Sequence, residues 1–242
     1  MAVYKWAELT REEIAKLCPS AITILPVASI EQHGLHMATS TDTVLVDEVI
    51  ARACVTVSDE IDILLAPTQT YGSSDHHLPF GGTLSLTSST FYAVLRDLLR
   101  SLAKAGCGRS LLLNGHGGNA AICRVAADDA SREENMMIVS ASYWELIEPP
   151  NDVADFPGHA GKFETSLMLS ARPELVHMER AQPSPGNEPP RNRGLQISAP
   201  DLWSRINGFT DDPRSAEVEI GEELLDRCAQ AVAQALRGIA AL

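Results

Sequence analysis

Four short apolar runs alternate with segments of helical spacing and constrain the fold more than any other feature. The runs cover residues 21–28, 61–67, 109–114 and 136–142, and each has the length of a buried strand. Apolar residues recur at helical spacing in residues 43–60, 87–106 and about 119–133. Strands that alternate with helices predict the α/β class, with a parallel sheet covered on both faces.

The two ends of the chain carry further helical signals. A capping box from Thr10 to Glu13 predicts a short first helix. The segment "ETSLMLSARPELV" predicts a helix that stops before Pro173. Residues 181–194 are rich in Pro, Gly and Asn and predict an exposed loop, and an amphipathic helix is expected from about residue 215 to 242. Because no repeat or linker divides the sequence, we expect one domain over residues 1–242.

Charge and cysteine usage exclude several classes of protein. The net charge is −13, so the surface repels phosphate groups, and we expect neither a nucleic acid nor a membrane as partner. The five cysteines form no CxxC pair, which indicates reduced thiols and neither a zinc ribbon nor a disulfide framework. The N-terminus lacks the apolar core of a signal peptide, and no apolar run reaches about 20 residues. These features favour a cytoplasmic protein.

Six of the seven histidines lie in four short segments that also contain glycine. The segments are "SIEQHGLH", "YGSSDHHLPFGGT", "LLLNGHGGN" and "PGHAGKFETS". Each of the first three follows a predicted strand. Because the carboxyl ends of parallel strands meet at one edge of the sheet, these histidines are expected to face one cleft.

Carboxylates accompany the histidines, and this combination is the ligand set of Zn²⁺, Mn²⁺ or Fe²⁺. Glu31 and His33 are two residues apart, so an extended chain presents both on one face. Each can then serve one of two neighbouring metals, with Asp42 as a bridge. Metal pairs about 3.5–4 Å apart are typical of hydrolytic sites.

Other readings of these segments stay open at this point. A strand, a glycine loop and a helix N-terminus can cradle phosphate, although "NGHGGN" lacks the Lys-Ser/Thr of a Walker loop. Single histidines near turns are usually structural, and we expect His177 to be so. His36 can be either a structural residue or a neighbour of the metal ligands.

Taken together, the motifs resemble the creatininase family of metal-dependent amidohydrolases. "EQHG" with Asp42 eleven residues after Glu31, then "NGHGGN" and "GHAGKFETS", come in the order and spacing of that family. "YGSSDHHLPFGGTLSL" is similar to the family's stretch of the YG-x-S-x-E-H type. The resemblance spans roughly residues 20 to 175. It implies a three-layer α/β/α sandwich with a mostly parallel sheet, two divalent metals (Zn or Mn, or else Fe) and a homohexamer.

The resemblance also implies roles for the metal-binding residues. Glu31, Asp42 and His116 would bind one metal. His33 and Asp42 would bind the other, so that Asp42 bridges them. In creatininases proper a further carboxylate follows the histidine that matches His116, but this chain has Gly118 there. Glu164 is the expected replacement.

Two further positions depart from the family pattern. His76 stands where the family usually has Glu, and Gly81 stands where it usually has Pro. An additional imidazole at the rim of the pocket and a looser loop would both alter specificity.

The implied activity is hydrolysis of a C–N bond in a small amide or cyclic amide, other than a peptide bond, by a metal-bound hydroxide. Catalytic roles are expected for His159, as proton donor, and for Glu164. His159 can alternatively orient Glu164. Ser74 and His77 are expected to bind polar groups of the substrate, and Tyr143 with Trp144 to flank a planar ring, although the two aromatic residues can also be core.

Three alternatives to this activity stay open. One is hydrolysis of another carbonyl substrate of the family, namely a formamide, a precursor peptide, a lactone or a cyclic ketone. Another is a small-molecule binding protein that has lost catalysis. The last is a phosphate or nucleotide binder built on "NGHGGN", which would not need Glu31 or Asp42.

Overall fold

A parallel sheet forms the centre of the computed structural model, which describes residues 2–151, 153, 156–186 and 197–242. Its strand order is β1-β3-β2-β4-β5, and every neighbouring pair is parallel. The strands are β1 (Val3–Lys5), β2 (Ile22–Val27), β3 (Ile63–Leu65), β4 (Arg109–Asn114) and β5 (Met137–Ser142). The α/β class and the mostly parallel sheet predicted from the sequence are confirmed.

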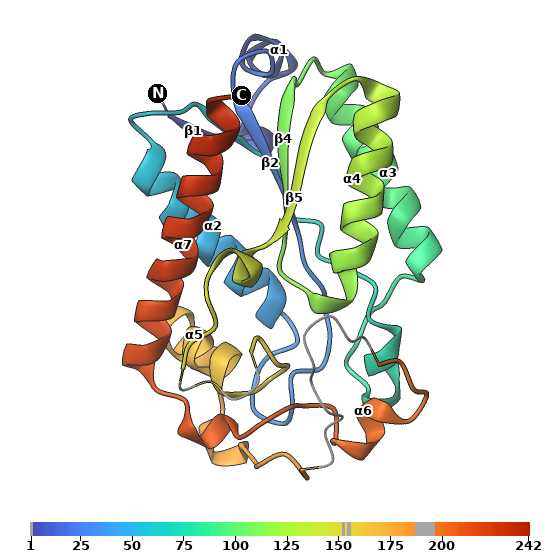
Figure 1. Cartoon of the computed structure of the whole chain (residues 1–242), viewed down its shortest axis with the longest axis vertical. Coiled ribbons are helices and arrows are strands. Elements are labelled where there is room, and N and C mark those ends of the chain that lie inside the picture. Colours follow the sequence, from blue (N-terminus) through green and yellow to red (C-terminus); the bar gives the residue numbers. More distant parts are fainter. Residues whose placement is uncertain (1, 152, 154–155, 187–196) are drawn as a thin grey trace.

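Helices cover both faces of the sheet (Figure 1). They are α1 (Arg11–Leu17), α2 (Thr41–Val57), α3 (Ser88–Lys104), α4 (Ala120–Glu134), α5 (Lys162–Ala171), α6 (Leu202–Arg205) and α7 (Val218–Ala240). Short 3₁₀ segments lie at Trp6–Glu8, Asp75–Phe80, Gly117–Asn119, Tyr143–Leu146, Pro173–Leu175, Met178–Arg180 and Pro213–Ser215.

The side chains of β2 show how the sheet separates two cores. Ile22 and Ile24 pack with α2, α5 and α7 on one face. Leu25 and Val27 point to the opposite face and pack with α1, α3 and α4. Successive side chains of a strand point to opposite faces, and a sheet covered on both faces therefore needs a continuous apolar run. This arrangement confirms the three-layer sandwich.

Helix α3 forms where its sequence signals indicate. The hydroxyl of Thr87 accepts from the N–H of Thr90 at 3.3 Å and caps the helix. Phe91, Leu95 and Leu99 bury one face of α3. The capping box of α1 is also present, with the N–H of Glu13 donating to the hydroxyl of Thr10.

The structure differs from the sequence expectations at the edges of elements. Strand β1 was not predicted, because it has three residues and pairs only with β3. Helix α2 begins at Thr41, which places Asp42 in its first turn rather than in the preceding loop. The predicted exposed loop at 181–194 lies partly outside the described residues, since 187–194 are among those not described.

None of the helices in the described ranges combines the length and apolar character that a membrane crossing requires.

The order of the strands creates a crevice at their carboxyl ends. From β2 the chain passes to β3 on one side and then to β4 on the other. Such a switch point between β2 and β4 is where α/β sheets bind ligands. Helices α5 and α6 lie beyond this end of the sheet (Figure 1).

Candidate metal centre

The loop after β2 carries Glu31 and His33 into the crevice. The N–H of Glu31 donates to the carbonyl of Thr39 at 3.1 Å, which holds the loop against the start of α2. Gly34 turns the chain with a φ of +64°, a conformation that favours glycine. The side chains of Glu31 and His33 are both fully buried. Charged groups are rarely buried without partners, so this loop is built for a function.

Asp42 lies between two imidazole rings. Its Oδ1 is 3.1 Å from Nε2 of His33, and its Oδ2 is 3.1 Å from Nδ1 of His116. The first turn of α2 favours a negative charge at this position, because helix N-termini carry partial positive charge. The two carboxylate oxygens of Asp42 therefore face two different histidines, as a bridging ligand would.

Three buried histidines each place one ring nitrogen against a main-chain carbonyl oxygen. The pairs are Nδ1 of His33 with Glu31 at 3.2 Å, Nε2 of His116 with Ser73 at 3.1 Å, and Nε2 of His159 with Gln32 at 2.9 Å. A carbonyl oxygen only accepts, so each of these nitrogens carries the proton. The opposite nitrogen of each neutral ring then presents a lone pair.

Those lone pairs point at carboxylates. Nε2 of His33 lies 3.1 Å from Asp42 and 3.7 Å from Glu164. Nδ1 of His116 is 3.2 Å, and Nδ1 of His159 is 3.4 Å, from Oε1 of Glu31. A lone pair and a carboxylate repel each other unless a proton or a cation lies between them. Histidine ligands of metals show this pattern, with the second nitrogen donating to a carbonyl or carboxylate.

Several buried polar atoms at this site make no hydrogen bond of standard geometry within the described residues. They are both carboxylate oxygens of Glu31, Nε2 of His33, Oδ2 of Asp42 and Nε2 of His77. Burying an unpaired carboxylate costs several kcal/mol, about 2–7 even for a neutral polar group. Divalent cations bound by the carboxylates and by Nε2 of His33 would remove that cost for those atoms, whereas Nε2 of His77 faces the cavity.

Donor atoms also converge closely enough for metal binding. Three groups each have one donor per residue within 4.8 Å of the others: Glu31 with His33 and His159, Glu31 with His76 and His116, and His33 with Asp42 and Glu164. Mixed imidazole and carboxylate donors suit Zn²⁺, Mn²⁺ or Fe²⁺. The residues present therefore fit the divalent metal that the sequence predicted.

Burial and the nearby carboxylates shift the pKa values of His33 and Glu164. Burial lowers the pKa of His33, but the charges of Asp42 and Glu164 outweigh it and raise the pKa to about 9. Burial raises the pKa of Glu164 to about 7, against the opposing effect of His33. Both shifts reflect concentrated negative charge in a dry environment. In the absence of a cation, protons take the place that a metal would occupy.

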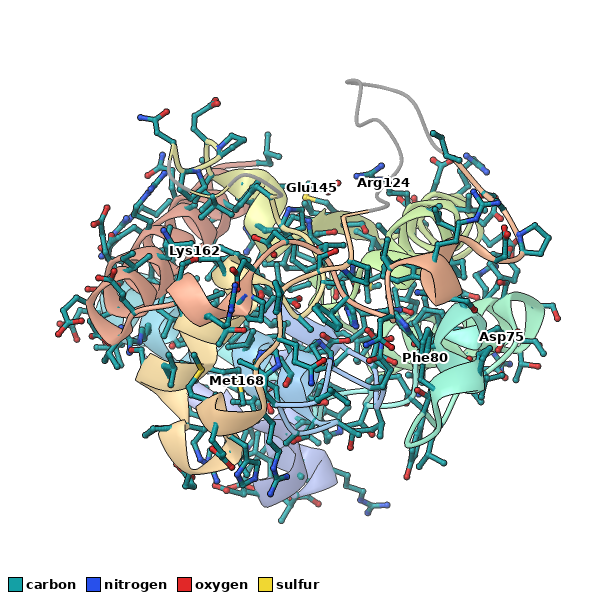
Figure 2. All side chains as sticks on the ribbon, turned by 90° about the horizontal axis from the view of Figure 1, so that it is seen from below. Asp75, Phe80, Arg124, Glu145, Lys162 and Met168 are labelled. Atoms are coloured by element: carbon teal, nitrogen blue, oxygen red, sulfur yellow. The ribbon has the colours of Figure 1, made fainter. Side chains whose placement is uncertain are left out.

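A cavity of about 740 Å³ opens onto these groups. Its lining includes Glu31, Asp42, His76, His77, His116, Trp144, His159, Glu164 and Trp203. No Lys or Arg is among its described lining residues. Figure 2 views this end of the molecule: Asp75 and Phe80, which flank His76 and His77, lie on the opposite side from Lys162 at the start of α5.

The four residues expected to contact substrate separate into two pairs. His77 and Trp144 line the cavity. Ser74 is fully buried beneath it, and its hydroxyl lies 3.1 Å from Nε2 of His116. Tyr143 is 1% exposed and packs edge-on against Trp144 in the core, with ring centroids 5.0 Å apart. Ser74 and Tyr143 therefore support neighbouring residues rather than form the cavity wall.

The two residues with expected catalytic roles come together from one segment. Glu164 lies in the first turn of α5, and its Oε2 accepts from the N–H of Ala160 at 2.6 Å. The ring of His159 contacts Gln32 and Glu31, and no hydrogen bond joins it to Glu164 within the described chain. The alternative role of His159, in which it orients Glu164, stays a prediction.

The remaining histidines lie apart from the cavity. Nε2 of His36 is 2.8 Å from the hydroxyl of Thr165, directly behind Glu164. His177 is exposed, with Nδ1 3.5 Å from a carboxylate oxygen of Glu179. The cavity lining includes neither ring.

Sequence reasoning missed two residues of the site. Gln32 is buried within the "EQHG" motif, and its amide contacts His77 and His159. Its position between two expected ligands was a signal that could have been used. Trp203 of α6 packs edge-on against His77, with centroids 4.5 Å apart, and no motif in its segment pointed to the site.

Comparison with known proteins decides the family. The family model named Creatininase and described as creatinine amidohydrolase matches residues 7–236. The chain belongs to the creatininase family. It is therefore a hydrolase that acts on amide C–N bonds.

Relatives within this family differ in substrate. Creatinine amidohydrolase of Pseudomonas putida is 31% identical over 96% of this chain and 94% of its own length. The mycofactocin precursor peptide peptidase of Mycobacterium ulcerans is 30% identical over 93% of this chain and 89% of its own. A peptidase at this level of similarity means that family membership does not restrict the chain to non-peptide bonds.

Solved creatininase structures share the fold over nearly the whole chain. A crystal structure of creatinine amidohydrolase aligns with a TM-score of 0.82 at 30% identity, over 96% of both chains. A structure described as creatininase with Mn aligns with a TM-score of 0.84 at 29% identity, over 98% of both. Another, described as a mutant creatininase of the Zn-Zn type, aligns with a TM-score of 0.81 at 29% identity, over 97% of both.

Proposed function

We propose that this protein is a metal-dependent amidohydrolase that hydrolyses a C–N bond of a small amide or cyclic amide at a binuclear centre. In this proposal Glu31 and His116 hold one cation, and His33 and Glu164 hold the other. Asp42 bridges the two. Zn²⁺ and Mn²⁺ are the proposed metals, because imidazole and carboxylate donors are mixed and because creatininase structures are described with each.

One observation carries the proposal. His33 and His116 each donate one ring N–H to a main-chain carbonyl and present the other nitrogen to buried carboxylates. A merely structural histidine would direct its nitrogens to groups of complementary polarity. Here the nitrogens that face the carboxylates are hydrogen-bond acceptors, as the carboxylates are. Two acceptors repel each other unless a cation or a proton lies between them.

The residues around the centre can perform the remaining chemistry. When bound, the two cations would lower the pKa of water and polarise the amide carbonyl. Burial and the nearby His77 hold the pKa of His159 well below its ordinary value, so the free ring is neutral. Its Nδ1 can accept the proton of the attacking water and return it to the leaving nitrogen. His77 and Trp144, on the cavity wall, would contact the substrate.

Peptide hydrolysis is the second candidate. A cavity of about 740 Å³ is large enough for more than one small ring, and a peptidase is among the relatives. The phosphate-binding alternative is weaker, since the cavity lining holds three carboxylates and no Lys or Arg among the described residues. Such a surface repels phosphate.

The proposal also includes a homo-oligomer, a hexamer as the family resemblance implies, acting in the cytoplasm on a small-molecule substrate. Light scattering on the purified protein tests the assembly.

Metal content tests the proposed centre directly. Elemental mass spectrometry of the wild type should find about two equivalents of Zn, Mn or Fe per chain, and Asp42→Ala should lose them. Asp47→Ala is the matched control, because Asp47 lies on the same helix but is exposed. Cyclic amides, formamides and short peptides are then screened with each metal. A wild type that takes up neither Zn nor Mn would exclude the mechanism.

A further inference from the structure

The surroundings of Gly118 leave no room for a side chain. A Cβ there would lie 2.4 Å from the carbonyl oxygen of Ser73 and 2.5 Å from Nε2 of His116. It would also lie 3.1 Å from Cε1 of His76. The carbonyl of Ser73 and the ring of His116 therefore close this space, and the ring of His76 is the next nearest group.

His76 is held in this place by other rings. Its imidazole is nearly parallel to that of His116, with an interplanar angle of 9° and centroids 5.9 Å apart. Trp203 packs against it with centroids 5.2 Å apart, and His77 lies 4.2 Å away. These contacts orient the ring towards the centre but supply no hydrogen bond.

The nitrogens of His76 are the decisive feature. The ring lines the cavity and is partly buried, yet neither nitrogen has a hydrogen-bond partner in the described part of the chain. One of these nitrogens lies within 4.8 Å of donor atoms of both Glu31 and His116. A histidine that served only as an aromatic wall would not need to converge with those two donors.

We propose that His76 is an additional ligand of the cation held by Glu31 and His116. This inference rests on the proposed binuclear function. As a ligand, His76 would give that cation a second imidazole. The negative charge of the cation's ligands would still come only from Glu31 and the shared Asp42. Imidazole favours Zn²⁺, Fe²⁺ or Ni²⁺, whereas carboxylate favours Mn²⁺, so His76 would bias this position towards zinc.

Titration of metal-free protein with ZnCl₂ or MnCl₂, followed by calorimetry, tests the assignment without any substrate. We expect wild type to bind two equivalents of zinc, and His76→Ala to bind one of them at least about tenfold more weakly. His76→Glu keeps a ligand at the position, so it should recover binding and shift the ratio of zinc to manganese affinity towards manganese. His177→Ala is the matched control, because that histidine is exposed. Thermal unfolding of each variant verifies that it is folded.

The outcomes separate this inference from the function on which it depends. If His76→Ala binds both equivalents as tightly as His177→Ala does, while Asp42→Ala loses them, the assignment of His76 is overturned and the binuclear centre stands. If wild type binds no metal, or Asp42→Ala binds as wild type does, the proposed function itself fails. Weaker binding in His76→Ala alone, with recovery in His76→Glu, supports the ligand role.

Discussion

The side-chain amide of Gln32 donates to Nδ1 of His77 at 2.8 Å. The orientation of this amide follows from its Oε1, which accepts from the N–H of Gly34 at 3.0 Å, and from its Nε2, which donates to the carbonyl of Gly208 at 2.6 Å. Nδ1 of His77 is therefore the acceptor, and Nε2 carries the proton, 3.7 Å from Glu31. Burial and the neighbouring His76 keep the pKa of His77 below its ordinary value, so His77 presents a neutral N–H donor at the cavity wall.

Removal of the Gln32 amide should weaken both the fold and the catalysis. In Gln32→Ala the Gly208 carbonyl and Nδ1 of His77 lose their donor, and we expect the free energy of unfolding to fall by about 1–3 kcal/mol. Activity should fall about 10–100-fold, because the tautomer of His77 is no longer selected. Urea unfolding and kcat measure the two effects. Gln69→Ala, which removes a single exposed hydrogen bond to Tyr71, should change neither.

Metal binding should stabilise the protein against heat. At free zinc about 100 times Kd, the expected stabilisation is about 2.7 kcal/mol. For a chain of this size, that raises Tm by about 5–10 °C. The measurement compares protein treated with a chelator before and after zinc addition. Asp42→Ala should show little of this rise, and an equal rise in that variant would place the bound zinc elsewhere.

The contact between α5 and α7 should be sensitive to one methyl group. A Cβ at Gly221 of α7 would lie 1.8 Å from the carbonyl oxygen of Ser166 in α5. We expect Gly221→Ala to cost about 1–3 kcal/mol through overpacking, and to weaken metal binding because α5 carries Glu164. Gly238 lies on the same helix with nothing within 4 Å of a Cβ. Gly238→Ala should therefore stabilise the protein by up to about 1 kcal/mol in the same urea titration.

His36 should make stability depend on pH. Burial, with a smaller effect from the charge of His33, lowers its pKa from 6.5 to about 4. Below pH 6.5 the unfolded chain binds a proton that the folded chain refuses, so the free energy of unfolding falls between pH 6.5 and about 4. His36→Gln can still bond to Thr165 but does not titrate. Unfolding of metal-free protein across this range should give a flatter profile for the variant, whereas parallel profiles would contradict this role for His36.

Trp203 should contribute to substrate binding without affecting the metal. Its ring lies 4.5 Å from that of His77 and 5.4 Å from that of His159, measured between centroids, and it lines the cavity. We expect Trp203→Ala to raise KM about tenfold, the equivalent of an aromatic contact of about 1.4 kcal/mol, while metal content stays constant. The assay uses whichever amide the screen identifies. Trp6→Ala is the control, and a KM raised equally there would point to a general loss of stability.

Local sequence signals were sufficient for much of the fold. Apolar runs such as 109–114 predicted strands because a strand buried on both faces must be apolar throughout. The helical spacing of apolar residues in 87–106 predicted α3, and the hydroxyl of Thr87 caps its start because the first N–H groups of a helix need a nearby acceptor. The three-residue β1 was beyond such signals, since its pairing with β3 is non-local.

The sequence by itself determined the family, and with it the expected donors, since ligand identity and spacing are written in motifs such as "EQHG" and "NGHGGN". Only the tertiary structure decided what surrounds those donors. It placed Ser74 under His116 and Tyr143 in the core, and it brought Trp203 to the cavity. The physical reason is that a tautomer, a hydrogen bond or a ring contact depends on distances of a few ångströms between segments far apart in the chain. No local pattern of residue types encodes such distances.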